Sequence, residues 1–130
     1  NGVVVLDDTV VMREGDLIDG VRLTSPAKPN QIRLDDRGRA ATLRAMSGGN
    51  YTIFLTPDID RFEGTRKVVS ENTPLDLDGD GDADALLYQF RFFPDSGPTF
   101  SLAETGIYIA ALLRYPGSTD EVPAVIFYPF

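Results

Sequence analysis

The sequence predicts an all-β protein whose strands form an antiparallel sandwich or a barrel-like sheet. Short runs rich in Val, Ile, Tyr, Phe and Thr recur along the whole chain, and these residues favour strands. The 9 prolines and 12 glycines lie between the runs, about where a sandwich would turn. No window of about twelve residues carries an apolar stripe at helical spacing.

Each run that we expect to form a strand is apolar or β-branched and is bounded by Gly, Pro, Asn or Asp. In the first half the predicted strands are 3–6, 9–13, 21–24, 31–34, 40–45 and 51–55. In the second half they are 67–70, 86–93, 99–102, 107–114 and 124–128. The clearest alternation lies in 86–93, where Leu86, Tyr88 and Phe90 share one face of the strand and Leu87 and Gln89 the other.

Composition limits the chemistry that is available. The chain has 130 residues and is 42% hydrophobic, which suits a single domain spanning residues 1–130. It contains no cysteine and no histidine, which excludes disulfides, thiolate metal sites and the commonest general base. The net charge of −8 would repel nucleic acid and anionic membranes, and no apolar run is long enough for a membrane-spanning helix. We therefore expect neither nucleic-acid binding nor membrane insertion.

The main chemical signal is the run from Asp76 to Asp84. It carries aspartates at alternate loop positions, with Gly81 at the sixth position. Calcium prefers six to eight oxygen ligands, and a loop with this spacing can turn alternate side chains inward while the glycine takes the sharp turn. The candidate metal ligands are Asp76, Asp78, Asp80, Asp82 and Asp84. The alternative is a solvated acidic turn between strands.

The loop resembles the D-x-D-x-D-G-x-x-D loops of FG-GAP and VCBS repeats, dockerin repeats and thrombospondin-type repeats. The resemblance implies side-chain ligands from Asp76, Asp78, Asp80 and Asp84, and a backbone carbonyl ligand from Asp82. The twelfth position is Leu87 rather than the glutamate of an EF-hand, so a further ligand must come from elsewhere. Three residues are open candidates for that ligand: Glu71, Asp95 and Glu104.

Asp58, Asp60 and Glu63 are candidates for a second, weaker calcium loop, although a charged loop without a metal is the more typical interpretation of such a segment. Catalysis is not expected. Without His or Cys a serine nucleophile would need a lysine partner, and neither Lys28 nor Lys67 lies in an S-x-x-K pattern. An enzyme that uses carboxylates alone is therefore only a third hypothesis.

The chain also shows a faint internal repeat, with units at 9–55 and 66–128. Residues 10–15 align with 67–72, and residues 32–38 align with 100–106. The apolar run 51–55 aligns with 124–128, with a third copy of that run at 3–6. The unit resembles tandem β-repeats of large bacterial secreted and surface proteins, through Arg13-Glu14-Gly15-Asp16, Asp35-Asp36-Arg37-Gly38 and Ile53-Phe54-Leu55. The resemblance implies an extracellular or cell-surface location.

The two terminal runs, 3–6 and 124–128, are strongly apolar and almost uncharged. A strand of this kind with a bare edge invites pairing with another chain. We expect a secreted, calcium-stabilised structural module that forms homopolymers through these strands, such as a filament subunit or a repeat of a surface protein. The two ends could instead pair within one subunit and close its sheet. The alternative function is a calcium-dependent carbohydrate-binding module, because aromatic residues crowd the second half.

Overall fold

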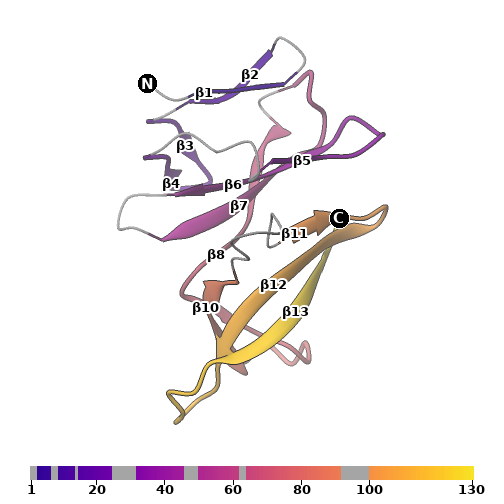
Figure 1. Ribbon diagram of the computed structural model, residues 1–130. Coiled ribbons are helices and arrows are strands. Elements are labelled where there is room, and N and C mark those ends of the chain that lie inside the picture. The colour runs from indigo at the N-terminus through magenta and orange to yellow at the C-terminus, as the bar shows by residue number, and fades with distance from the viewer. Residues whose placement is uncertain are drawn as a thin grey trace.

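The computed structural model describes residues 3–6, 9–13, 15–24, 32–45, 50–61, 64–91 and 100–130, and it confirms the all-β prediction (Figure 1). All strand pairs in these segments are antiparallel, and no sheet closes into a barrel. The predicted strand residues 31, 92, 93 and 99 lie outside the described residues. None of the described residues forms a helix long and apolar enough to span a membrane.

The strands follow the predicted runs closely, with two short additions, β3 and β9. The elements are β1 (Val3–Leu6), β2 (Thr9–Arg13), β3 (Leu17–Ile18), β4 (Val21–Arg22), β5 (Ile32–Leu34), β6 (Ala40–Ala45), β7 (Tyr51–Thr56), β8 (Arg66–Ser70), β9 (Thr73–Leu75), β10 (Ala85–Phe90), β11 (Phe100–Leu102), β12 (Gly106–Arg114) and β13 (Val122–Pro129).

Two larger sheets form a sandwich. One has the order β5-β6-β7-β8, and the other has the order β11-β12-β10-β9 with β13 paired to β12 at its edge. Their facing sides share the main hydrophobic core, to which β6 and β7 contribute Ala41, Leu43, Ile53 and Leu55. The five-stranded sheet contributes Leu75, Ala85, Leu87, Phe90, Phe100, Ile107, Ile109, Ala111 and Leu113. Burial of these side chains is the main force that holds the two layers together.

The four-stranded sheet is covered on its other face as well. The β3–β4 hairpin packs Ile18, Val21 and Leu23 against Ala40 and Phe54, which alternate with the residues of the main core. This face also buries Arg44, which is 1% exposed, a position that the sequence did not predict. The five-stranded sheet is different, because its outer face leaves apolar side chains exposed.

The chain crosses from one sheet to the other at Glu71 and Asn72, between β8 and β9. The Glu71 carboxylate is buried, and its two oxygens accept backbone N–H groups from Tyr51 on β7 and Phe90 on β10, each at 2.9 Å. Asn72 takes a left-handed φ of 61° and donates its backbone N–H to the carbonyl of Leu87. One side chain thus connects the two layers.

A second polar contact joins the β5–β6 turn to the β11–β12 turn. Asp35 accepts the backbone N–H groups of Arg37 and Arg39 and the Nε of Arg39. The other end of the Arg39 guanidinium donates to the backbone carbonyl of Glu104 and lies 4.2 Å from the centre of the Phe130 ring. Burial raises the pKa of Asp35, but the hydrogen bonds from Arg39 and Arg37 outweigh it and hold the pKa below the ordinary 3.8.

The strand pairings of the first half recur in the second half. The β1–β2 and β7–β8 pairs each contain one bulge. The bulge leaves Val11 without a cross-strand partner in the first pair and Val68 in the second. These two residues match in the sequence alignment of 10–15 with 67–72. The β3–β4 and β9–β10 hairpins also match. Ile18 pairs with Val21 across a two-residue turn, whereas Leu75 pairs with Ala85 across the nine-residue segment 76–84.

One detail of the sequence alignment differs from the structure. The alignment of 51–55 with 124–128 sets Phe54 against Phe127. In the four-stranded sheet, Ile32 pairs with Thr42 and Thr42 pairs with Phe54. In the five-stranded sheet, Phe100 pairs with Ile109 and Ile109 pairs with Ile126. Because Ile32 aligns with Phe100, Phe54 corresponds to Ile126, and both face a core. The alignment matched two phenylalanines that lie on opposite faces of their sheets.

Replacing Glu71 by Gln should lower the free energy of unfolding by about 1–3 kcal/mol, because one backbone N–H loses a buried acceptor. Glu104→Gln is the matched control. Glu104 pairs with Arg37 on the surface with 70% of its side chain exposed, so its loss should cost less than about 1 kcal/mol. Urea unfolding at neutral pH measures both values, and equal effects would contradict the role given to Glu71.

The Asp35 contact should depend on pH. Because the pKa of Asp35 is lower in the folded state than in the unfolded chain, its stabilisation is present above about pH 4 and is lost as the pH falls through the folded value. Asp35→Asn should cost about 1–3 kcal/mol at pH 7 and progressively less below pH 3.8. Urea unfolding across this range tests the slope, and a constant difference would contradict it.

Candidate metal centre

The aspartate-rich loop, residues 76–84, occupies the tip of the β9–β10 hairpin. Its two ends are fixed by the pair Leu75 and Ala85, which are buried in the main core, and by a 2.8 Å hydrogen bond from the backbone N–H of Asp84 to the carbonyl of Leu75. The loop thus extends from a base that is fixed in the core, and its aspartates are exposed or half-buried. This is the position that Asp19-Gly20 occupies in the β3–β4 hairpin.

The first part of the loop wraps around Asp76. Its two carboxylate oxygens accept the backbone N–H groups of Gly79, at 2.7 Å, and Gly81, at 2.8 Å. Both glycines have left-handed φ values, 82° and 97°, which residues with a Cβ rarely adopt. The hydrogen bonds from Gly81 and Gly79 hold the pKa of Asp76 below its ordinary value of 3.8, so the carboxylate is ionised at neutral pH.

Asp84 closes the loop from the other end. One of its oxygens accepts the backbone N–H of Leu77 at 2.7 Å and that of Asp78 at 3.3 Å. Asp78 in turn accepts the N–H of Asp80, and Asp80 accepts the N–H of Asp82. These successive Asx turns bend the loop so that its first, third and ninth residues approach one another.

These residues, Asp76, Asp78 and Asp84, form a group that could hold a metal ion, since each offers a carboxylate oxygen within 4.8 Å of the others. Oxygens around one calcium ion, bound at 2.3–2.6 Å, lie at most about 5 Å apart, so the spacing suits such an ion. Asp80 and Asp82 are exposed on the same loop but do not belong to this group.

The candidates for a further ligand lie elsewhere. Glu71 bonds to the backbones of Tyr51 and Phe90, and Glu104 pairs with Arg37, so neither carboxylate belongs to the loop group. Asp95 lies outside the described residues.

At the suggested second loop, Asp58 caps a turn by accepting the N–H of Asp60, and its carboxylate lies 3.8 Å from the Nε of Arg61. Glu63 lies outside the described residues. Among the residues that the structure describes, only the 76–84 loop gathers three carboxylates.

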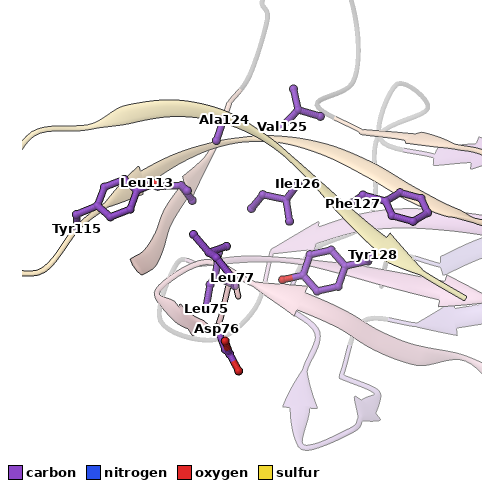
Figure 2. A pocket seen from close by; sticks show the side chains of 10 residues that line it. All are labelled: Leu75, Asp76, Leu77, Leu113, Tyr115, Ala124, Val125, Ile126, Phe127 and Tyr128. Atoms are coloured by element: carbon purple, nitrogen blue, oxygen red, sulfur yellow. The ribbon is translucent and has the colours of Figure 1, made fainter. Parts of the chain in front are cut away.

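The sequence did not predict that this loop would lie beside the last strand. A groove of about 420 Å³ runs between the start of the loop and β13 (Figure 2). Leu75, Asp76 and Leu77 line one side, and residues 124–128 line the other. Figure 2 shows the Asp76 carboxylate turned away from Ile126 and Tyr128. Burial raises the pKa of the Tyr128 phenol, which therefore remains neutral at physiological pH.

Asp78→Ala should weaken calcium binding by about tenfold or more, which corresponds to about 1.4 kcal/mol. Asp82→Ala should have a smaller effect, because its side chain is outside the group of three and its carbonyl is the expected ligand. Calorimetric titration of the two variants measures the difference, and equal losses would contradict the assignment of loop positions.

Comparison with known proteins identifies no relative of this chain. No family model matches it, and neither a curated protein nor a solved structure does. The function is therefore inferred from the chemistry of the loop and from the arrangement of the strands.

Proposed function

We propose that this chain is an extracellular structural β-module that is stabilised by calcium and assembles with copies of itself through its terminal strands. The observation that carries the proposal is the groove beside β13, because the aspartate-rich loop and the last strand line it together. An ion at the loop and a neighbour at the strand would thus act on one region of the molecule.

Calcium is the cation that the loop chemistry favours. The candidate ligands are hard carboxylate oxygens, without imidazole or thiolate, and this set suits calcium or magnesium rather than a transition metal. Magnesium demands near-ideal octahedral geometry and gives up its waters reluctantly, whereas calcium tolerates irregular loops. Exposed loops of this kind suit the millimolar calcium found outside cells.

Assembly is supported by the edge of β13. Phe130 donates its N–H to the carbonyl of Thr105 on the β12 side, so backbone groups of alternate residues point toward β12. The N–H groups of Val125 and Phe127 therefore face the open edge. Pro123 and Pro129 share that edge but have no N–H to offer.

The alternative in which the two chain ends pair with each other does not match the described strands. In the described pairs β1 joins β2, and β13 joins β12. Among the strands that the structure describes, none pairs with the outer edge of β13, which is eight residues long. Monomeric proteins usually avoid leaving an apolar, uncharged edge of this length open.

A carbohydrate-binding role is the second hypothesis, and one observation favours it. Tyr108 and Phe127 form an exposed aromatic pair with ring centroids 4.8 Å apart, and exposed rings can stack on sugars. Tyr115 and Tyr128 line the groove close by.

Millimolar calcium should raise the melting temperature of the purified chain by several degrees over EDTA, because about a tenfold excess over a Kd typical of extracellular calcium modules adds about 1.4 kcal/mol. It should also produce multimers in light scattering, since bound calcium reduces the repulsion between subunits of charge −8. The double variant Asp78→Asn and Asp84→Asn is the control and should not respond.

An unchanged melting temperature in EDTA would contradict the calcium site. A monodisperse monomer in millimolar calcium would contradict self-assembly. If that monomer bound immobilised glycans in the presence of calcium, the carbohydrate-binding hypothesis would replace the structural one.

A further inference from the structure

The exposed face of the five-stranded sheet corresponds to a face that is buried elsewhere in the same chain. Because Phe54 corresponds to Ile126, the neighbouring residues Ile53 and Leu55 correspond to Val125 and Phe127. Ile53 and Leu55 are 0% and 2% exposed, beneath the five-stranded sheet, whereas Val125 and Phe127 are 72% and 41% exposed. Ala41 is buried in the same way, and its counterpart Tyr108 is exposed.

The open edge of β13 corresponds to an edge of β7 that is paired with β8. Glu71 donates its backbone N–H to the carbonyl of Tyr51, so the backbone groups of Tyr51, Ile53 and Leu55 point toward β8. Their counterparts in β13 are Pro123, Val125 and Phe127, whose backbone groups point toward the open edge. In the first half of the chain, the corresponding face of β7 is covered by the other sheet, and the corresponding edge of β7 is paired with β8.

In both other copies of this strand, β1 and β7, the edge is covered by the same kind of strand. β1 and β7 are each paired with the strand that opens the following unit, β2 and β8, in the same register and with the same one-residue bulge. β13 is the third strand of the series and has no such partner among the described strands. A strand of the β2 type therefore fits its edge.

We propose that β13 and the outer face of the five-stranded sheet form a docking surface for a second copy of this chain, and that the β2 strand of that copy pairs with β13. This inference rests on the self-assembly in the proposed function and specifies the strands and their register. β2 is the available donor, because it is held in a two-stranded sheet with β1, whereas β8 belongs to the four-stranded sheet of the sandwich.

The register follows from the two existing pairs. Ile53 is opposite Val69 and Leu55 is opposite Arg66, which places Val125 opposite Met12 and Phe127 opposite Thr9 of the second copy. In this arrangement β13 takes the place that β1 occupies in the neighbour. Donor and acceptor surfaces differ, so the contact is heterologous and repeats from head to tail.

The absence of native cysteine allows a direct test in the full chain. The double variant Met12→Cys and Val125→Cys, oxidised in millimolar calcium, should give a ladder of disulfide-linked multimers, because paired residues of adjacent strands lie within disulfide distance. The variant Val4→Cys and Val125→Cys tests the other pairing, in which β1 of the neighbour adds to β13. Leu34→Cys with Val125→Cys is the control, since Leu34 is 59% exposed but lies on β5. The reduced variants should keep the melting temperature of the parent chain.

A second pair of variants tests the face without cross-linking. Val125→Lys should abolish multimers in light scattering, because burying the added charge under another layer is unfavourable. Leu34→Lys is the matched control and should leave assembly unchanged. Neither variant should shift the melting temperature of the monomer appreciably, since both side chains are exposed.

The outcomes separate this inference from the proposed function. Multimers in calcium that cross-link only through Val4, or through no pair, would overturn the β2 register and leave self-assembly standing. Multimers that persist in Val125→Lys would overturn the docking face. Monomers in every condition, without cross-links, would overturn both the inference and the assembly part of the proposed function.

Discussion

The buried carboxylate of Glu71 is the contact on which the layered arrangement depends. It sits where the chain leaves the four-stranded sheet and enters the five-stranded one, and it accepts one backbone N–H from each sheet. A buried donor without a partner would cost about 1–3 kcal/mol, so both sheets must keep the spacing that satisfies it. The direction of β9, and hence the place of the aspartate-rich loop, follows from this spacing.

The aspartate-rich loop adds chemistry to a hairpin whose fold does not require it. The β3–β4 hairpin shows that the two flanking strands can be joined by Asp19-Gly20 alone, with left-handed φ values of 49° and 78°. Replacing this turn by residues 76–84 leaves the buried base of the hairpin unchanged, because Leu75, Ala85 and Leu87 take the places of Ile18, Val21 and Leu23 in a core. The cost of gathering several carboxylates is confined to the loop, where backbone N–H groups from Gly79 and Gly81 offset part of it.

Much of the fold could be predicted from the sequence, because strand composition and turn residues are local properties. In the β10 strand, local composition did not predict which residues are buried. Alternation predicted Leu86, Tyr88 and Phe90 on one face, but Leu87 and Phe90 are the buried residues, because a bulge shifts the register between Leu87 and Gln89. At the metal centre, the spacing identified the loop. The gathering of Asp76, Asp78 and Asp84 without Asp80 and Asp82 depends on backbone hydrogen bonds that spacing alone does not specify. The buried Arg44 and the bridging role of Glu71 depend on tertiary contacts and had no signal in the sequence.

The two prolines of β13 fit a strand that accepts one partner and rejects others. Pro123 and Pro129 remove the N–H donors at both ends of the open edge and leave those of Val125 and Phe127 between them. Two copies of β13 that paired with each other would gain few hydrogen bonds, because the prolines of each copy have no N–H to donate to the carbonyl groups of the other. A short bulged strand such as β2, with five residues, needs donors only in the middle of the edge. The same prolines that protect the edge from unselective aggregation thus restrict the length and register of the strand that can cover it.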